Sequence, residues 1–263
     1  MYSFDYQRPA TRAAATAAIQ GDARYLAGGQ SLVQAMKLRL SSPTDLIDLN
    51  AIGDLKALKA ESNAVTIGAM VRHAEVAASS AVRKAIPALA SLAGIIGDRQ
   101  VRHMGTIGGS LANNDPAADY PAAVLALGAT IVTSKRKIEA DKFFKGLYET
   151  ALEPAELITA VSFPVPKRAA YMKFKNPASR FAIVGVFVAD FGGKVRVGVT
   201  GAGPCAFRQA DMEKALASKF APESVANIKV KADGLNSDLH ASPEYRAHLI
   251  TVMAKRAVEA AMK

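Results

Sequence analysis

Two paired-glycine segments constrain what this 263-residue chain can fold into more than any other feature. They are residues 27–31, with the sequence AGGQS, and residues 106–110, with the sequence TIGGS. Glycine leaves no side chain between a ligand and the backbone, and it adopts positive φ without the cost of about 1–2 kcal/mol that other residues incur. Each segment is therefore predicted to be a tight loop that emerges from regular structure.

Loops of this kind can bind anions. Successive exposed backbone N–H groups form a concavity for oxygen anions, and Gln30, Ser31, Thr106 and Ser110 add uncharged side-chain donors. The alternative for either segment alone is an ordinary turn, since a chain with 19 glycines contains chance pairs. Neither segment fits G-x-x-x-x-G-K-[ST], so a P-loop triphosphatase is not supported.

The pattern around the glycine segments divides the chain into three units. In residues 1–57, a helix at 11–19 precedes a strand at 24–26, a helix at 32–40 and a strand at 45–49, which predicts a βαβ arrangement. Residues 58–164 combine a strand at 64–69 with helical segments at 74–78, 81–96 and 120–127, and with a hairpin whose turn carries Lys135-Arg136-Lys137. The sequence Pro164-Val165-Pro166 marks the next boundary.

Residues 167–263 have a different pattern. Strands at 182–189 and 194–200 are joined by Asp190-Phe191-Gly192-Gly193 as a hairpin, and Pro243 precedes a helix at 244–262. Residues 201–206 also fit the dinucleotide pattern G-x-G-x-x-A, and residues 207–217 look helical. Because this segment follows a hairpin rather than opening a parallel βαβ unit, we interpret it as a structural turn.

Composition excludes several classes of protein. A single cysteine, Cys205, cannot hold an iron–sulfur cluster or a structural zinc, and is interpreted as a small buried hydrophobe. The net charge of +10 is compatible with nucleic acid, an anionic cofactor, a membrane surface or an acidic partner subunit as the binding partner. Aromatic residues make up only 6% of the chain and Trp is absent, and the sequence contains no nucleic-acid-binding motif. No apolar stretch is long enough for a membrane span, and the N-terminal residues show no secretory signal, so we expect a cytoplasmic location.

Longer stretches around both glycine segments resemble a known family. Residues 25–32 (YLAGGQSL) and 105–122 (GTIGGSLANNDPAADYPA) are similar to the two FAD-binding loops of the medium subunit of molybdenum hydroxylases, which include xanthine dehydrogenase and aerobic carbon monoxide dehydrogenase. The likeness runs nearly end to end, through FDY at 4–6, IGA at 67–69, ELI at 156–158 and DLHASPEYR at 238–246.

The resemblance implies an α+β fold. A two-subdomain FAD-binding domain of the vanillyl-alcohol-oxidase (PCMH) type would be followed by a C-terminal domain with an antiparallel sheet and helices. The two segments would bind the FAD pyrophosphate through backbone amides; their residues are Ala27, Gly28, Gly29, Gln30, Ser31, Thr106, Ile107, Gly108, Gly109 and Ser110.

Two further positions match family residues. Asp119 would bond the ribitol or ribose side of FAD, with an N-cap for the helix from Tyr120 as the alternative. Lys173 matches a basic residue near the flavin that would pair with the reduced ring, with a solvated strand lysine as the alternative. Gln30 stands where the carbon monoxide enzyme has His, and Phe181 where it has Tyr.

The implied function is electron transfer within an oxidoreductase complex. A molybdenum cofactor in a large subunit would oxidise the substrate, and two [2Fe-2S] clusters in a small subunit would carry electrons to the FAD of this chain. A quinone or another acceptor would then take them, in a complex expected to be a dimer of heterotrimers. We find no catalytic acid–base pair and interpret His73, His103, His240 and His248 as structural. The alternatives are a stand-alone flavin oxidase and a flavin-free basic binding module.

Overall fold

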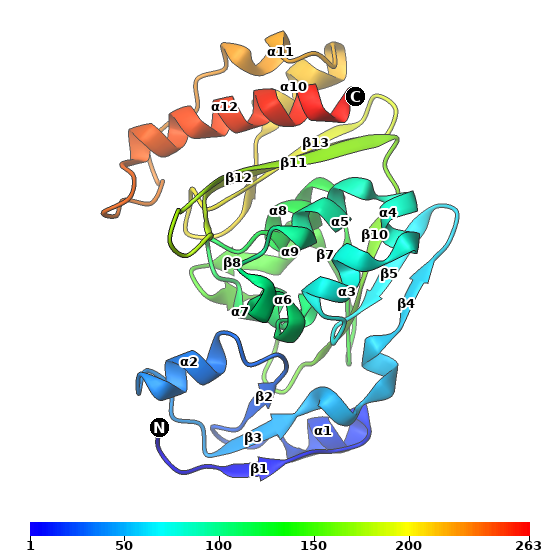
Figure 1. Cartoon of the computed structure of the whole chain (residues 1–263), viewed down its shortest axis with the longest axis vertical. Coiled ribbons are helices and arrows are strands. Elements are labelled where there is room, and N and C mark those ends of the chain that lie inside the picture. The colour runs from blue at the N-terminus through cyan, green and yellow to red at the C-terminus, as the bar shows by residue number, and fades with distance from the viewer.

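The computed structural model describes residues 1–263 as three parts stacked along the long axis of the molecule (Figure 1). The N-terminal part is a three-stranded parallel sheet in the order β1-β3-β2. Its elements are β1 (Asp5–Gln7), α1 (Arg12–Ala18), β2 (Arg24–Leu26), α2 (Leu32–Lys37) and β3 (Asp45–Asp48), followed by the 3-10 turns Leu49–Ala51 and Gly53–Lys56. The predicted βαβ arrangement is confirmed, because β2 and β3 are parallel and α2 connects them.

The middle part is a five-stranded antiparallel sheet covered by short helices. The sheet has the order β4-β5-β10-β6-β7, and β10 pairs with both β5 and β6. The strands are β4 (Leu58–Ala60), β5 (Ala64–Gly68), β6 (Thr130–Thr133), β7 (Lys137–Glu139) and β10 (Ile158–Pro164), with a small hairpin of β8 (Phe144–Gly146) and β9 (Glu149–Thr150). The helices are α3 (His73–Ala78), α4 (Ser80–Ala85), α5 (Pro87–Gly94), α6 (Arg99–Met104), α7 (Ile107–Asn113), α8 (Tyr120–Ala126) and α9 (Ala140–Phe143).

In the middle part, one predicted helix is corrected and one predicted hairpin is confirmed. The helix predicted over 81–96 is two helices, because α4 ends where Pro87 begins α5; Pro has no N–H and is favoured in a first turn. The hairpin at Lys135 is confirmed by the antiparallel pairing of β6 and β7. Lys135 lies in its turn and forms an ion pair of 3.1 Å with Glu153, whereas Lys137 already belongs to β7 and pairs with Val132.

The C-terminal part is a four-stranded antiparallel sheet in the order β11-β12-β13-β14, covered by α12. Its elements are β11 (Arg168–Lys175), β12 (Ala182–Asp190), β13 (Val195–Thr200), β14 (Phe207–Arg208), α10 (Ala210–Ser218), α11 (Glu223–Ala226) and α12 (Pro243–Ala261). The predicted hairpin is confirmed, and Asp190 closes it by accepting hydrogen bonds from the amides of Gly192 and Gly193. The helix predicted over 207–217 is wrong at its start, since Phe207 and Arg208 pair with β13.

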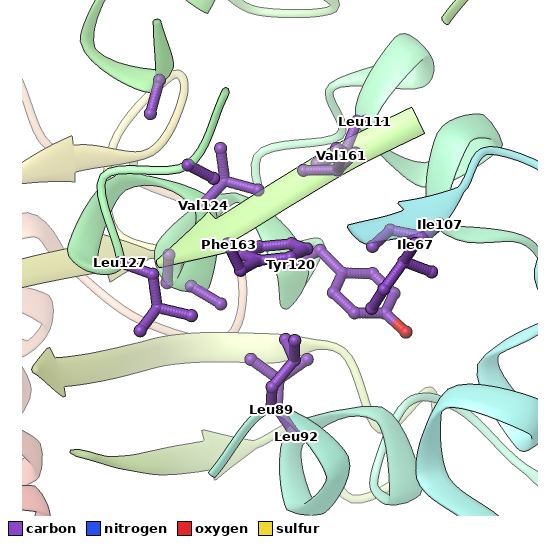
Figure 2. Packing of buried hydrophobic residues seen from close by; sticks show 14 of the residues in the cluster. Ile67, Leu89, Leu92, Ile107, Leu111, Tyr120, Val124, Leu127, Val161 and Phe163 are labelled. Carbon is purple, nitrogen blue, oxygen red and sulfur yellow. The ribbon is translucent and has the colours of Figure 1, made fainter. Parts of the chain in front are cut away.

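The middle and C-terminal parts share a hydrophobic core. Val184, Val186 and Val188 of β12 pack with α12, while Phe187 and Ala189 on its other face belong to the core of the middle part. Alternate residues of a strand point to opposite faces, so β12 is buried throughout. Figure 2 shows this larger core, in which Tyr120 and Phe163 are fully buried.

Candidate functional site

The two paired-glycine segments meet in the structure. Gly28 lies so close to the end of α6 that a Cβ there would collide with the carbonyl oxygen of Met104 and with Gly105. A Cβ on Gly109 would lie 3.4 Å from that of Ala27. Both segments line a cavity of about 590 Å³, which is within the usual range for a bound cofactor.

The first segment is a loop with unused hydrogen-bond donors. It connects β2 to α2, and Gly29 has a φ of +70°, in the left-handed region that favours glycine. The backbone amides of Gly28, Gly29, Gln30 and Ser31 donate no hydrogen bond within the chain. The Gln30 side chain is used locally, since its Nε2 donates to the Gly28 carbonyl at 3.2 Å. Successive free amides in one loop at a cavity wall can bind an oxygen anion.

The second segment is not the predicted loop. Thr106 is the N-cap of α7, and both of its glycines lie in the first turn of that helix. The amide of Gly109 donates to Thr106 Oγ1 at 3.2 Å, and that of Gly108 to the Ala69 carbonyl at 2.9 Å. The amide of Ile107 donates to Val71, and its side chain is fully buried in the core. These donors are therefore already occupied.

Packing explains the second glycine pair. A Cβ on Gly108 would lie 2.5 Å from the Cβ of Ala69, so only glycine lets α7 approach the end of β5 this closely. Thr106, Gly108, Gly109 and Ser110 still line the cavity, and the hydroxyl of Ser110 has no hydrogen-bond partner in the chain.

Asp119 lines the same cavity at the start of α8, but its carboxylate does not cap the helix. It accepts a hydrogen bond of 2.6 Å from the Tyr171 hydroxyl and forms an ion pair of 2.9 Å with Lys173. Burial raises the pKa of Asp119, and the Lys173 ammonium opposes that shift. Burial, then the charge of Asp119, raises the pKa of Tyr171 well above its usual value.

Lys173 is not the solvated lysine of the alternative interpretation, since its side chain is 2% exposed. Besides Asp119, its ammonium donates to the carbonyls of Ile95 and Arg180, each at 3.0 Å. It therefore ties together the end of α5, the start of α8 and the loop between β11 and β12. The ammonium is held behind Asp119 and is not among the groups that line the cavity.

The loop between β11 and β12 forms part of the cavity wall. Asn176 Oδ1 shapes it by accepting hydrogen bonds from the amides of Ala178 and Ser179 at 2.9 and 3.0 Å. Residues 178–181 line the cavity, and Phe181 is 49% exposed at its edge.

His73 is a cavity residue that the sequence analysis interpreted only as structural. It is buried at the start of α3, its amide donates to the Gly105 carbonyl at 3.0 Å, and its Nδ1 has no partner. Burial, reinforced by the charge of Arg102, lowers the pKa of His73 to about 4, so the ring is neutral at pH 7. A lone histidine after a strand gives no sequence signal of this placement.

Cys205 is half-buried, and burial raises the pKa of its thiol. That direction makes the thiol a poor nucleophile at neutral pH, although the side chain is not fully buried as the sequence predicted. No helix of the chain is long and apolar enough to cross a membrane. No cluster of three or more His, Cys, Asp or Glu side chains has an arrangement suited to a metal ion.

Comparison with known proteins identifies relatives of the whole chain. Residues 2–166 match the family described as the FAD binding domain in molybdopterin dehydrogenase. The chain is 36% identical to the carbon monoxide dehydrogenase medium chain of Afipia carboxidovorans, over 98% of this chain and 96% of the relative. It is 33% identical to the glyceraldehyde dehydrogenase medium chain of Sulfolobus acidocaldarius, over 97% and 96%. The crystal structure of quinoline 2-oxidoreductase from Pseudomonas putida 86 superposes with a TM-score of 0.90 at 28% identity, over 99% of this chain and 97% of that one.

Proposed function

The chain belongs to the FAD-binding medium subunits of the molybdenum hydroxylases, and from that premise we propose that its FAD is held in the cavity between the two paired-glycine segments. The subunit is part of an oxidoreductase, and its fold is the α+β fold of that family. The observation that carries the placement is the set of four free amides at residues 28–31.

The residues of the cavity fit this cofactor. The amides of Gly28, Gly29, Gln30 and Ser31 would bind the diphosphate, and Ala27 and Gly109 would leave room beside it. On the other wall, Thr106 and Gly108 would bring the backbone close to the FAD, and Ser110 would add a free hydroxyl. Ile107 is buried in the core and holds this wall in place. A neutral His73 avoids a buried positive charge at this wall.

Asp119 and Lys173 would act as a unit. Asp119 lines the cavity and would contact the ribitol or ribose hydroxyls of FAD. Lys173 would hold that carboxylate in place rather than touch the flavin ring, because its ammonium is already bound to Asp119 and two carbonyls.

The oxidation of the substrate and the rest of the electron path would lie outside this chain. When bound, FAD supplies two-electron redox chemistry, and the protein binds and orients it. Carbon monoxide dehydrogenase, glyceraldehyde dehydrogenase and quinoline 2-oxidoreductase are named for different substrates, so membership of this family does not name the substrate of the complex. Because this chain has one cysteine, we propose that a small iron–sulfur subunit and a large molybdenum subunit complete the complex, as a dimer of heterotrimers in the cytoplasm. A quinone would accept the electrons.

Gly29→Val tests the placement of FAD. Valine strains the backbone at a φ of +70° and would displace the amides of the loop, so we expect the complex to lose most of its FAD. Gly21→Val is the matched control, since Gly21 has a φ of +52° and nothing near its missing Cβ. The ratio of flavin absorbance to protein is the measurement. A Gly29→Val complex with as much FAD as the Gly21→Val complex would contradict the proposal.

A further inference from the structure

His73 has one ring nitrogen that remains accessible at the wall of the FAD cavity. The residue lines that cavity although it is only 5% exposed. Its Nδ1 is closed off from solvent and has no hydrogen-bond partner. Its Nε2 also makes no hydrogen bond in the chain, but it is not closed off. Nε2 is therefore the nitrogen through which the ring can meet a ligand in the cavity.

Packing holds the ring of His73 in one place. An isolated antiparallel bridge between Arg72 and Thr106 joins the start of α3 to the start of α7, and the His73 amide donates to the Gly105 carbonyl at 3.0 Å. The ring packs against that of Tyr120, with 5.4 Å between the ring centroids. Tyr120 is itself fully buried in the core of the middle part (Figure 2). The imidazole is thus fixed before any ligand arrives.

Gly105 leaves the space beside Nε2 open. A Cβ on Gly105 would lie 2.6 Å from Nε2 and 2.9 Å from Cδ2 of the His73 ring, so any other residue would press against this nitrogen. The backbone of Gly105 has a φ of −62° and a ψ of 142°, a conformation that every residue adopts. The close approach of the ring, and not the shape of the turn, therefore favours glycine at this position.

The position of the ring proton follows from this arrangement. The lowered pKa of His73 keeps the ring neutral at pH 7, so it carries a single N–H. A buried N–H without a partner is costly, and Nδ1 has no acceptor within reach. The proton is therefore favoured on Nε2, where an acceptor in the cavity can meet it. His73 offers one uncharged donor to the ligand.

This donor lies next to the free amides of the first paired-glycine segment. A Cβ on Gly28 would lie 2.7 Å from the Cα of Gly105, so Gly105 separates the His73 ring from the first of those amides by one residue only. The cavity has no excess of cationic side chains, because its charged lining residues are Arg24, Arg180, Asp98, Asp115, Asp119 and Glu156. A diphosphate bound here depends on uncharged N–H donors, and each additional one contributes to affinity.

We propose that His73 is an FAD-binding residue whose Nε2–H donates a hydrogen bond to a phosphate oxygen of the diphosphate, beside the amides of residues 28–31. The assignment rests on the proposed placement of FAD in this cavity. The imidazole adds a donor without adding a charge, so it acts as a fifth N–H group next to the four backbone amides.

Three substitutions at His73 separate a donor from a merely structural ring. His73→Phe keeps an aromatic ring against Tyr120 and removes the N–H. His73→Gln places an amide nitrogen about where Nε2 lies, whereas the shorter His73→Asn places it about where Nδ1 lies. His103→Phe is the matched control, because His103 is exposed and does not line the cavity. Each FAD-depleted complex is titrated with FAD in a calorimeter, and its thermal midpoint is measured before FAD is added.

The expected pattern differs between affinity and stability. FAD should bind about tenfold more weakly, or worse, to His73→Phe and His73→Asn, because a hydrogen bond to a charged group is lost. His73→Gln and His103→Phe should stay within about twofold of wild type. Without FAD, the thermal midpoint of His73→Phe should equal or exceed that of wild type, since an apolar ring replaces a buried nitrogen that has no partner.

Three results would overturn the proposal and leave the FAD placement intact. Wild-type affinity in His73→Phe would show that the ring donates nothing to FAD. Tighter binding by His73→Asn than by His73→Gln would place the donor on Nδ1. Equal losses of affinity in His73→Phe and His73→Gln, each with a lowered thermal midpoint, would make the ring structural. A wild-type complex that does not bind FAD at all would overturn the proposed function itself.

Discussion

The two paired-glycine segments look alike in sequence and differ in what their glycines do. The first is an open loop whose four amides are free, and Gly29 takes a backbone conformation that favours glycine. The second is the first turn of α7, its amides are used within the chain, and Gly108 is required because Ala69 lies against it. One glycine pair thus exposes donors to a ligand, whereas the other brings two pieces of backbone together to shape the opposite wall. Similar composition does not imply the same physical role.

The largest expected effect comes from adding one methyl group to the second segment. Gly108→Ala places a Cβ against the backbone and side chain of Ala69, so we expect a loss of about 3 kcal/mol of unfolding free energy together with loss of FAD. Gly53→Ala is the control, since nothing lies within 4 Å of its Cβ position. Denaturant unfolding measures the effect. If Gly108→Ala were as stable as wild type and failed only to bind FAD, Gly108 would serve ligand binding, as the first segment does, and not packing.

His73, which contacts Gly105 just before the second segment, should make the stability of the chain depend on pH. The pKa of His73 is about 4 in the folded chain and 6.5 for the ordinary side chain, so the unfolded state binds the proton more readily. Stability from a neutral His73 is complete above about pH 6.5 and is lost as the pH falls toward 4, by up to about 3 kcal/mol.

Unfolding curves at several pH values, compared between wild type and His73→Asn, isolate this contribution from that of the carboxylates. We expect the decline between pH 6.5 and 4 to be shallower in the variant. Parallel curves for the two proteins would show that His73 titrates normally in the folded state.

The sequence predicted that both segments line one site, but not how the second one is built. The loop predicted at TIGGS rests on the missing side chain of glycine and its freedom at positive φ, and two adjacent glycines are also poor helix formers. Its contact with Ala69, across many residues of chain, overrides that local preference. The Asp119–Lys173 pair was missed for the same reason, because a 54-residue separation leaves no local pattern. Local patterns did predict the strand β2, the start of α2 and the hairpin at Asp190, although α2 ends at Lys37 rather than at the predicted residue 40.

Removal of the cap of α7 should have a smaller effect. Thr106 Oγ1 accepts the hydrogen bond from Gly109, and Thr106→Ala should cost about 1 kcal/mol of unfolding free energy. Thr106→Ser, which keeps the hydroxyl, should restore most of it. Equal thermal midpoints for wild type and Thr106→Ala would show that the cap contributes nothing to this wall.

The smallest effect on stability is expected at the start of α2. Ser31 occupies the N-cap position, but its side chain makes no capping hydrogen bond, so Ser31→Ala should leave the unfolding free energy nearly unchanged. If its hydroxyl contacts the diphosphate, FAD should bind several-fold more weakly, by about 1 kcal/mol. Titration of the FAD-depleted complex measures this. If Ser31→Ala lowered stability but left FAD affinity unchanged, Ser31 would be a structural cap like Thr106 and not a ligand-binding residue.

The most direct test of the central claim is amide hydrogen exchange in the complex with and without its FAD, resolved over both segments. We expect the amides of Gly28, Gly29, Gln30 and Ser31 to exchange fast without FAD and slowly with it. The amides of Ile107, Gly108 and Gly109 should be slow in both states, because they are hydrogen-bonded within the chain. If FAD binding leaves the exchange of residues 28–31 unchanged, the first segment does not hold the diphosphate and the account is wrong.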